Sequence, residues 1–152
     1  MLTRIGIEDP RQPELLAMLE DSDRYYAALY PAESNHLLDA SMLAGPEVTF
    51  LVARVPDRIA GFGAVVRHSA EFGEIKRMYV DPAMRGMRLG RSILAALEDR
   101  ARAEGLPCLR LETGVKQPEA IALYRSAGYE EIPAFGDYQP DPLSIFMEKR
   151  LV

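Results

Sequence analysis

The chain has 152 residues, of which 48% are hydrophobic and 27% are charged, and its formal net charge is −5. This length predicts one domain over residues 1–152 with a sizeable core, and no apolar run approaches the roughly 18–20 residues that span a membrane. Because phosphate binding needs a basic surface, the net charge argues against nucleic acid as a general partner.

The chain begins with a short predicted strand, residues 2–7, which lacks the apolar core of a signal peptide. We therefore expect a cytoplasmic protein. Pro13 suits the first turn of a helix, whose apolar pattern weakens from residue 22 onward. The tyrosines and polar residues over 25–36 fit either a substrate wall or, equally, a surface helix pair, before a short helical piece at 37–43.

Two extended stretches, residues 48–55 and 59–67, predict a β-hairpin because a Pro-Asp-Arg turn separates them. Gly61 and Gly63 lie on one face of the second strand. Glycines in a strand indicate a bulge or another backbone that passes close by, so we expect one of these at this place in the sheet.

Residues 74–80 form the next predicted strand. Strict alternation places Glu74, Lys76 and Met78 on one face and Arg77 on the other. Charged side chains in a central strand are costly unless a polar cleft or paired charges receive them. The strand therefore predicts a functional site, with an edge strand and solvated charges as the alternative.

The segment after this strand breaks at Asp81-Pro82 and alternates arginine and glycine over residues 85–91. It leads into a helix predicted over 88–104, with apolar residues at every fourth position. Backbone N–H groups at a helix start, the helix dipole and nearby guanidinium groups attract anions. The segment therefore predicts an anion site.

A strand at 107–113 follows, and the order strand–helix–strand predicts a right-handed crossover with a parallel strand pair. Its Cys108 is the only cysteine, so it forms no internal disulfide and gives no metal-site spacing. Pro118 opens a second helix, and two more strands flank a loop at 133–142. This order predicts an α/β (α+β mixed) fold with a mixed, mostly antiparallel sheet and helices on both faces.

Three segments, residues 78–82, 85–91 and 117–129, carry a resemblance to a known family. Their order and separation resemble the motifs of the Gcn5-related N-acetyltransferase (GNAT) superfamily, and the match covers essentially the whole chain. The resemblance implies an acyl-CoA-dependent N-acetyltransferase. It also implies acetyl-CoA as co-substrate, no metal, and a sheet that opens between strands 74–80 and 107–113.

The resemblance places the pantetheine arm along strand 74–80 and the pyrophosphate on the loop and helix start that follow. The implied coenzyme-binding residues are Met78, Tyr79, Val80, Arg85, Gly86, Met87, Arg88, Leu89, Gly90, Arg91, Ser92 and Gln117. Arg88 departs from the family, which commonly has glycine there. We expect a helical φ at Arg88, which tolerates arginine and adds positive charge toward the phosphates. Gln117 replaces a common asparagine.

Tyr124 matches the tyrosine that many relatives place near the thioester sulfur, which implies a proton donor to the departing thiolate. The attacking amine must lose a proton, so a base is also needed. Glu74 is the first candidate, because alternation puts it on the same face as Met78. Glu112, at the end of the neighbouring strand, is the second, and the two histidines are weaker candidates.

The expected acceptor is a primary amine of a small molecule or amino acid. The candidate substrate-binding residues are Tyr26, Tyr30, His36 and Tyr138. A protein or peptide amine is an alternative acceptor, and a domain that binds acetyl-CoA without turnover, as a sensor or structural subunit, is an alternative function. Dimers are common in the superfamily, so the resemblance also allows a homodimer that uses the C-terminal strand.

Overall fold

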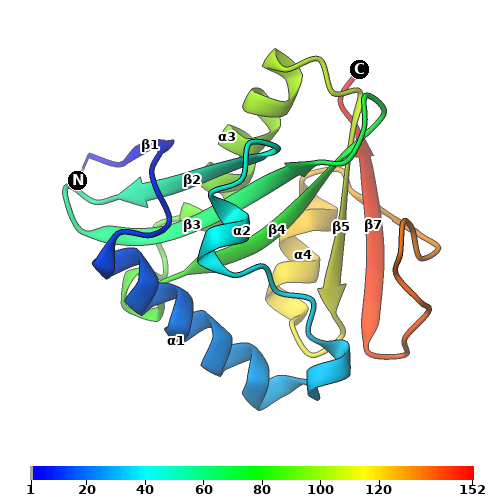
Figure 1. Ribbon diagram of the computed structural model, residues 1–152, viewed down its shortest axis with the longest axis horizontal. Coiled ribbons are helices and arrows are strands. Elements are labelled where there is room, and N and C mark those ends of the chain that lie inside the picture. Colours follow the sequence, from blue (N-terminus) through cyan, green and yellow to red (C-terminus); the bar gives the residue numbers. More distant parts are fainter. Residues whose placement is uncertain (1) are drawn as a thin grey trace.

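Seven strands form one sheet, in the order β1-β2-β3-β4-β5-β7-β6, in the computed structural model of residues 2–152 (Figure 1). The strands are β1 (Arg4–Ile7), β2 (Val48–Arg54), β3 (Ile59–Arg67), β4 (Gly73–Val80), β5 (Cys108–Gly114), β6 (Glu130–Ile132) and β7 (Ser144–Arg150). The helices are α1 (Pro13–Leu29), α2 (Ala40–Leu43), α3 (Leu89–Ala103) and α4 (Pro118–Ser126), with short 3₁₀ turns η1 (Ala32–Ser34) and η2 (Pro82–Met84).

The sheet is mixed, as the sequence predicts. Every neighbouring pair of strands is antiparallel except β4 and β5, which α3 connects. These two strands are paired only over Gly73–Ile75 and Leu109–Leu111, and Figure 1 shows them diverging beyond that point. The sheet is therefore open beside the carboxyl end of β4.

Helices cover both faces of the sheet (Figure 1). The apolar stripe of α3, which includes Ile93 and Leu97, is buried against the sheet, and α4 joins it through Tyr124. On the opposite face, Leu15 and Leu19 of α1 pack against buried residues of β2 and β3. Complete burial of one such aliphatic side chain contributes about 1.5–3 kcal/mol, so these two layers hold the sheet in place.

Helix α1 is longer than the sequence pattern suggests. It continues to Leu29, so Tyr25 and Tyr26 are helical rather than part of an irregular stretch. The buried Ser22 hydroxyl donates to the Leu19 main-chain oxygen at 2.8 Å, which lets a polar residue face the core. Pro31 then disfavours a helical conformation at the preceding residue, and the helix ends. None of the helices within residues 2–152 has the length and apolar character needed to cross a membrane.

Strand β4 contains a bulge at Arg77, whose φ is 59°. Arg77 and Met78 together face Gly63 of β3, where an added Cβ would lie 2.6 Å from the Met78 sulfur. A bulge, one of the two alternatives expected from the glycines, is present in the partner strand β4. The predicted alternation is wrong, because the extra residue reverses the faces beyond it. Met78 packs with the α3-side core, whereas Glu74 and Lys76 lie on the α1 side.

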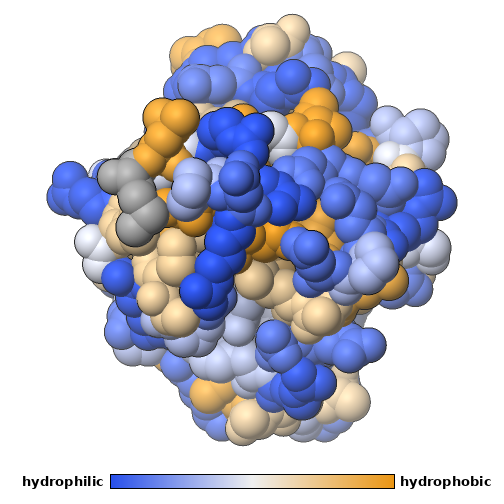
Figure 2. Space-filling view, turned by 90° about the vertical axis from the view of Figure 1, so that its left-hand side faces the viewer, coloured by the Kyte–Doolittle hydropathy of each residue, from blue (hydrophilic) through white to orange (hydrophobic). Residues whose placement is uncertain are grey.

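The β1 edge of the sheet is mostly polar on its outer surface. Figure 2 turns this side of the molecule toward the viewer and shows hydrophilic side chains over most of it, with apolar side chains in separate patches.

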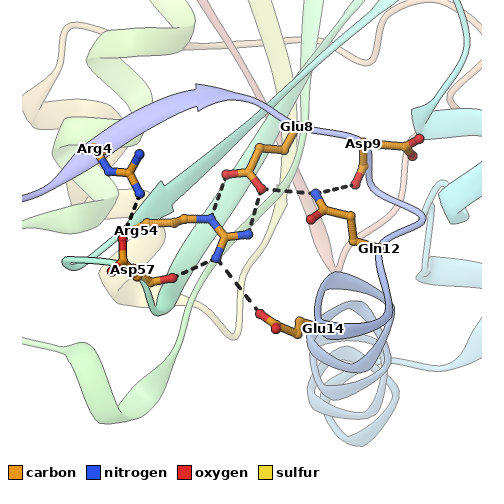
Figure 3. Close-up of polar contacts among 7 residues, drawn as sticks. All are labelled: Arg4, Glu8, Asp9, Gln12, Glu14, Arg54 and Asp57. Atoms are coloured by element: carbon orange, nitrogen blue, oxygen red, sulfur yellow. Dashed lines mark hydrogen bonds and ion pairs between the residues drawn. The ribbon is translucent and has the colours of Figure 1, made fainter.

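Arg54 of β2 makes the central polar contacts near this edge (Figure 3). Its guanidinium donates to both carboxylate oxygens of Glu8 at 2.8 Å and to the main-chain oxygen of Asp57 at 2.7 Å. The hydrogen bond from Arg54 lowers the pKa of Glu8, against the opposing effect of burial. The contact ties the β1–α1 connection to the β2–β3 hairpin.

Candidate active site

A cavity of about 580 Å³ lies at the opening between β4 and β5. Lys76 from one face of β4 and Met78 from the other both line it, together with residues of α1, β5 and α4. The cavity therefore passes from one side of the sheet to the other. At one end it reaches the loop that precedes α3, and at the other it reaches Tyr138.

Met78 and Val80 turn main-chain groups toward this opening. The N–H of Asp81 donates to the Ala60 oxygen at 2.8 Å, so the residue before it, Val80, faces away from β3. The Met78 carbonyl accepts a hydrogen bond from the Tyr26 hydroxyl at 2.9 Å. Both residues line the cavity.

The start of α3 presents unpaired amides. The N–H of Ser92 makes the first helical hydrogen bond, to the Arg88 oxygen at 3.1 Å, and no side chain caps the helix. The N–H groups of residues 89–91 therefore have no helical acceptor. An added Cβ at Gly90 would lie 3.2 Å from the Leu123 side chain, so glycine allows α3 to begin close against α4. This is the geometry of an anion site.

Arg88, the residue before α3, is in the left-handed conformation, with φ 57° and ψ 31°. The expected helical φ is therefore wrong, because the loop enters α3 through a left-handed residue at the position where the family commonly has glycine. That conformation costs a residue with a Cβ roughly 1–2 kcal/mol. Arg88 lines the cavity, as does Arg85, which forms an exposed ion pair with Glu119 at 3.3 Å.

Nine of the twelve implied coenzyme-binding residues line the cavity, and three do not. Met87, Arg91 and Ser92 lie outside the lining. The Arg91 guanidinium donates to the Ser126 hydroxyl at 2.6 Å, so it joins α3 to α4. Gln117 lines the cavity, and its side-chain oxygen accepts a hydrogen bond from the Tyr30 hydroxyl at 3.2 Å.

Tyr124 lies on the buried face of α4, and its side chain lines the cavity with only 6% of its surface exposed. Its ring packs edge-on against Tyr129, with the centroids 5.8 Å apart. Burial raises the pKa of Tyr124, so the phenol remains protonated and is a hydrogen-bond donor at neutral pH.

Glu74 lines the cavity but is surrounded by hydrogen-bond donors. His68 Nε2 lies 2.8 Å from one carboxylate oxygen, and the Tyr138 hydroxyl and Lys76 Nζ contact the other. The side chain is almost fully buried. Both carboxylate oxygens of Glu74 are therefore already engaged by neighbouring side chains.

Glu112 of β5 also lines the cavity, in a different electrostatic setting. The Ser144 hydroxyl donates to one of its oxygens at 2.7 Å. Burial raises the pKa of Glu112, because removal of water penalises the ionised form. A carboxyl group with a raised pKa is well matched to proton transfer near neutral pH.

The four predicted substrate-binding residues all line the cavity. The Tyr30 hydroxyl accepts the Lys116 N–H at 3.1 Å, which fixes the ring against the β5–α4 connection. The rings of His36 and Tyr138 meet edge-on at 5.0 Å. Two loops far apart in the sequence thus close the same end of the cavity.

Among the lining residues that the sequence did not indicate as site residues are two lysines, Lys76 and Lys116. The Lys76 ammonium donates to the Tyr138 hydroxyl at 2.7 Å. The unusual charge of this strand was a signal for Lys76. Lys116 donates to the Leu29 main-chain oxygen at 2.9 Å, and nothing in its sequence context distinguishes it from a surface lysine.

Comparison with known proteins agrees with this geometry. Residues 15–129 match the model of the acetyltransferase (GNAT) family. A protein named IAA acetyltransferase from Azospirillum brasilense is 51% identical over 148 residues, which cover 97% of each chain. The chain belongs to the GNAT family of acetyltransferases. It is therefore an enzyme of the family that the sequence motifs resemble.

Two further similarities extend over most of this GNAT acetyltransferase. A crystal structure described as an acyl-CoA N-acyltransferase from Klebsiella pneumoniae superposes with a TM-score of 0.84, at 41% identity and 99% coverage of both chains. The aminoalkylphosphonate N-acetyltransferase of Salmonella typhimurium is 30% identical over 127 residues, which are 76% of this chain and 82% of the relative. GNAT acetyltransferases use acetyl-CoA, and the relatives differ in their acceptors.

Proposed function

We propose that this GNAT acetyltransferase moves an acetyl group from acetyl-CoA to the primary amine of a small molecule. The observation that carries the proposal is the single cavity that joins the arginine–glycine loop to Tyr30 and Tyr138. A donor at one end and an acceptor at the other would meet at the strand opening, beside Tyr124 and Glu112. Such positioning supplies much of the acceleration in transfer reactions.

The loop end of the cavity fits a coenzyme that bears phosphates. The unpaired amides of residues 89–91 and the side chains of Arg85 and Arg88 provide donors and positive charge. The outward main-chain groups of Met78 and Val80 would pair with the amides of a pantetheine arm, as an added strand does. We infer that these residues hold acetyl-CoA, which supplies the activated thioester.

Three groups of the chain would then act on the reacting atoms. Glu112 takes the proton of the attacking amine as the C–N bond forms. The Met78 N–H donates to the carbonyl oxygen, where negative charge develops. Tyr124 donates its proton to the sulfur as the C–S bond breaks, and the proton from the amine restores the phenol through solvent. This sequence needs both reactants in the cavity at once.

The hydrogen bonds support Glu112 over Glu74 as the base. Glu74 already accepts from three neighbours, whereas burial of Glu112 raises its pKa. Glu112 also lines the cavity from β5, immediately after the segment of β5 that pairs with β4.

The name of one relative supports a small acceptor. An aminoalkylphosphonate, on which the Salmonella typhimurium relative is named to act, is a small amine. The acceptor end of the cavity is lined by aromatic and polar side chains from two loops and α1, which suits a small molecule held on several sides.

A turnover assay tests this function. Purified protein is mixed with acetyl-CoA and a panel of small primary amines, amino acids and one lysine-containing peptide. Thiol release is followed, and the products are identified by mass spectrometry. We expect amine-dependent thiol release with an N-acetylated small molecule. Coenzyme binding without amine-dependent release would indicate a sensor, and acetylation of the peptide alone would indicate a protein acceptor.

A further inference from the structure

A buried polar cluster connects the acceptor end of the cavity to the outer surface. Its centre is the Glu74 carboxylate, which is 3% exposed. Tyr138 and Lys76 contact one oxygen from the cavity side, and His68 contacts the other oxygen at 2.8 Å. The His68 side chain is 42% exposed and does not line the cavity. His68 therefore lies behind the acceptor wall, with Glu74 between.

The cluster fixes the Tyr138 side chain because its hydroxyl is both a hydrogen-bond donor and a hydrogen-bond acceptor. The hydroxyl donates to Glu74 and accepts from the Lys76 ammonium at 2.7 Å. Lys76 also lies 5.3 Å from the centre of the Tyr138 ring. A phenol that uses its donor and an acceptor site in this way has one favoured orientation.

A second route of contacts runs from His68 to Tyr138 through aromatic rings. His68 stacks on Phe72 with the ring centroids 5.2 Å apart, and Phe72 meets Phe135 edge-on at 5.8 Å. Phe135 in turn meets Tyr138 at 5.3 Å. The polar and the aromatic contacts therefore form a closed ring of neighbours, and His68 is its most exposed member.

We propose that His68 is a positioning residue for the acceptor site. Through Glu74 it holds Tyr138 in place, and Tyr138 forms part of the wall against which the amine binds. Glu74 then links the His68 imidazole to the Tyr138 phenol. The inference rests on the proposed function, since it assigns the Tyr138 end of the cavity to the acceptor.

Because of where it lies, the polar cluster should affect acceptor binding and not coenzyme binding. Tyr138 closes the end of the cavity that is remote from the Arg85–Gly90 loop. Loss of the His68 contact would leave one carboxylate oxygen of a buried Glu74 without its donor, and Tyr138 and Lys76 would rearrange around it. Acceptor binding would then weaken while coenzyme binding would not.

Steady-state kinetics test the proposal with three variants. His68→Ala is expected to raise the KM for the amine about tenfold, which corresponds to one lost hydrogen bond in a buried network, and to leave the KM for acetyl-CoA within about twofold. His68→Gln retains an N–H donor and should recover most of the loss. Glu71→Gln, in the same turn but outside the cluster, is the control. An unchanged amine KM in His68→Ala, or an equal change in both KM values, overturns the proposal.

A spectroscopic measurement tests the same contact without turnover. The protein is labelled with 3-fluorotyrosine, and the Tyr138 signal is identified by its loss in Tyr138→Phe. His68→Ala should shift or broaden that ¹⁹F signal, whereas Glu71→Gln should not. An unmoved Tyr138 signal in His68→Ala overturns the positioning role. If the wild type acetylates no amine, the proposed function fails, and the ¹⁹F spectrum still decides whether His68 holds Tyr138.

Discussion

The hydroxyl of Tyr26, on α1, donates a 2.9 Å hydrogen bond to the main-chain oxygen of Met78, on β4, 52 residues later in the chain. The contact lies beside the bulge at Arg77, in the part of β4 that extends beyond its pairing with β5. Burial raises the pKa of Tyr26 to about 12, so the phenol keeps its proton and remains a donor across the physiological range. One helix thereby steadies the strand that is proposed to bind the coenzyme.

We predict that Tyr26→Phe weakens this support. The variant removes the hydrogen bond to Met78 and keeps the ring, so it should lower the free energy of unfolding by about 1 kcal/mol and raise the KM for acetyl-CoA several-fold. Urea unfolding and steady-state kinetics measure the two effects. Tyr25→Phe is the matched control, because Tyr25 is the exposed neighbour on the same helix. Equal behaviour of the two variants would show that the Met78 contact contributes nothing.

Arg88→Gly should increase stability and weaken coenzyme binding. Glycine adopts the left-handed conformation at residue 88 without the Cβ strain, which should raise the free energy of unfolding by about 0.5–1 kcal/mol after the added chain entropy of glycine. Loss of the guanidinium should weaken coenzyme A binding about tenfold. Thermal melting and titration calorimetry measure both quantities. A stabilised variant with unchanged coenzyme affinity would reduce Arg88 to a strained loop residue.

Tyr124→Phe should lower kcat and leave coenzyme binding nearly intact. The substitution removes the proton donor and preserves the buried ring and its contact with Tyr129. A positioned acid typically contributes at least about a hundredfold to the rate. We expect a loss of that order in kcat, with the KM for acetyl-CoA within about twofold. Wild-type turnover in this variant would make Tyr124 a packing residue.

Glu112→Gln should change the pH dependence. As the proposed base, Glu112 would accept the proton in its ionised form. Burial raises its pKa, so wild-type kcat/KM should rise as the pH increases through that value. The glutamine variant should lose about a hundredfold in kcat/KM and the acid limb of the profile. If Glu74→Gln removes the limb and Glu112→Gln does not, Glu74 is the base.

The Glu112→Gln substitution should also change how the free energy of unfolding depends on pH. Because the pKa of Glu112 is raised in the folded state, its stabilising contribution is present at low pH and is lost as the pH rises through the folded pKa. The Glu112→Gln variant has no such group. Its stability relative to wild type should therefore increase with pH, which denaturant unfolding at several pH values measures.

The sequence predicted the element order, the strand opening and nineteen site residues, of which sixteen line the cavity, because these depend on periodic patterns and on two motifs. It failed where a local backbone feature changes the pattern. Alternation put Glu74 and Met78 on one face, but the bulge at Arg77 separates them. Gly61 and Gly63 were the visible signals of this bulge, and they do not say which residue of the partner strand is extra.

The conformation of Arg88 was also not predicted from the sequence. Helical periodicity extends through residue 88, and arginine ordinarily avoids a positive φ, so a helical conformation was the natural expectation. The contacts between distant loops could not be predicted from the sequence, for a different reason. His68, Glu74 and Tyr138 lie in three separate segments, and only the folded sheet brings them together.

The central claim is that donor and acceptor occupy one cavity and that the acetyl group passes directly between them. Initial velocities measured over a matrix of acetyl-CoA and amine concentrations test it most directly. Direct transfer predicts double-reciprocal lines that intersect, with no acetyl group retained on the protein. Parallel lines, together with an acetylated protein after incubation with acetyl-CoA alone, would contradict the account.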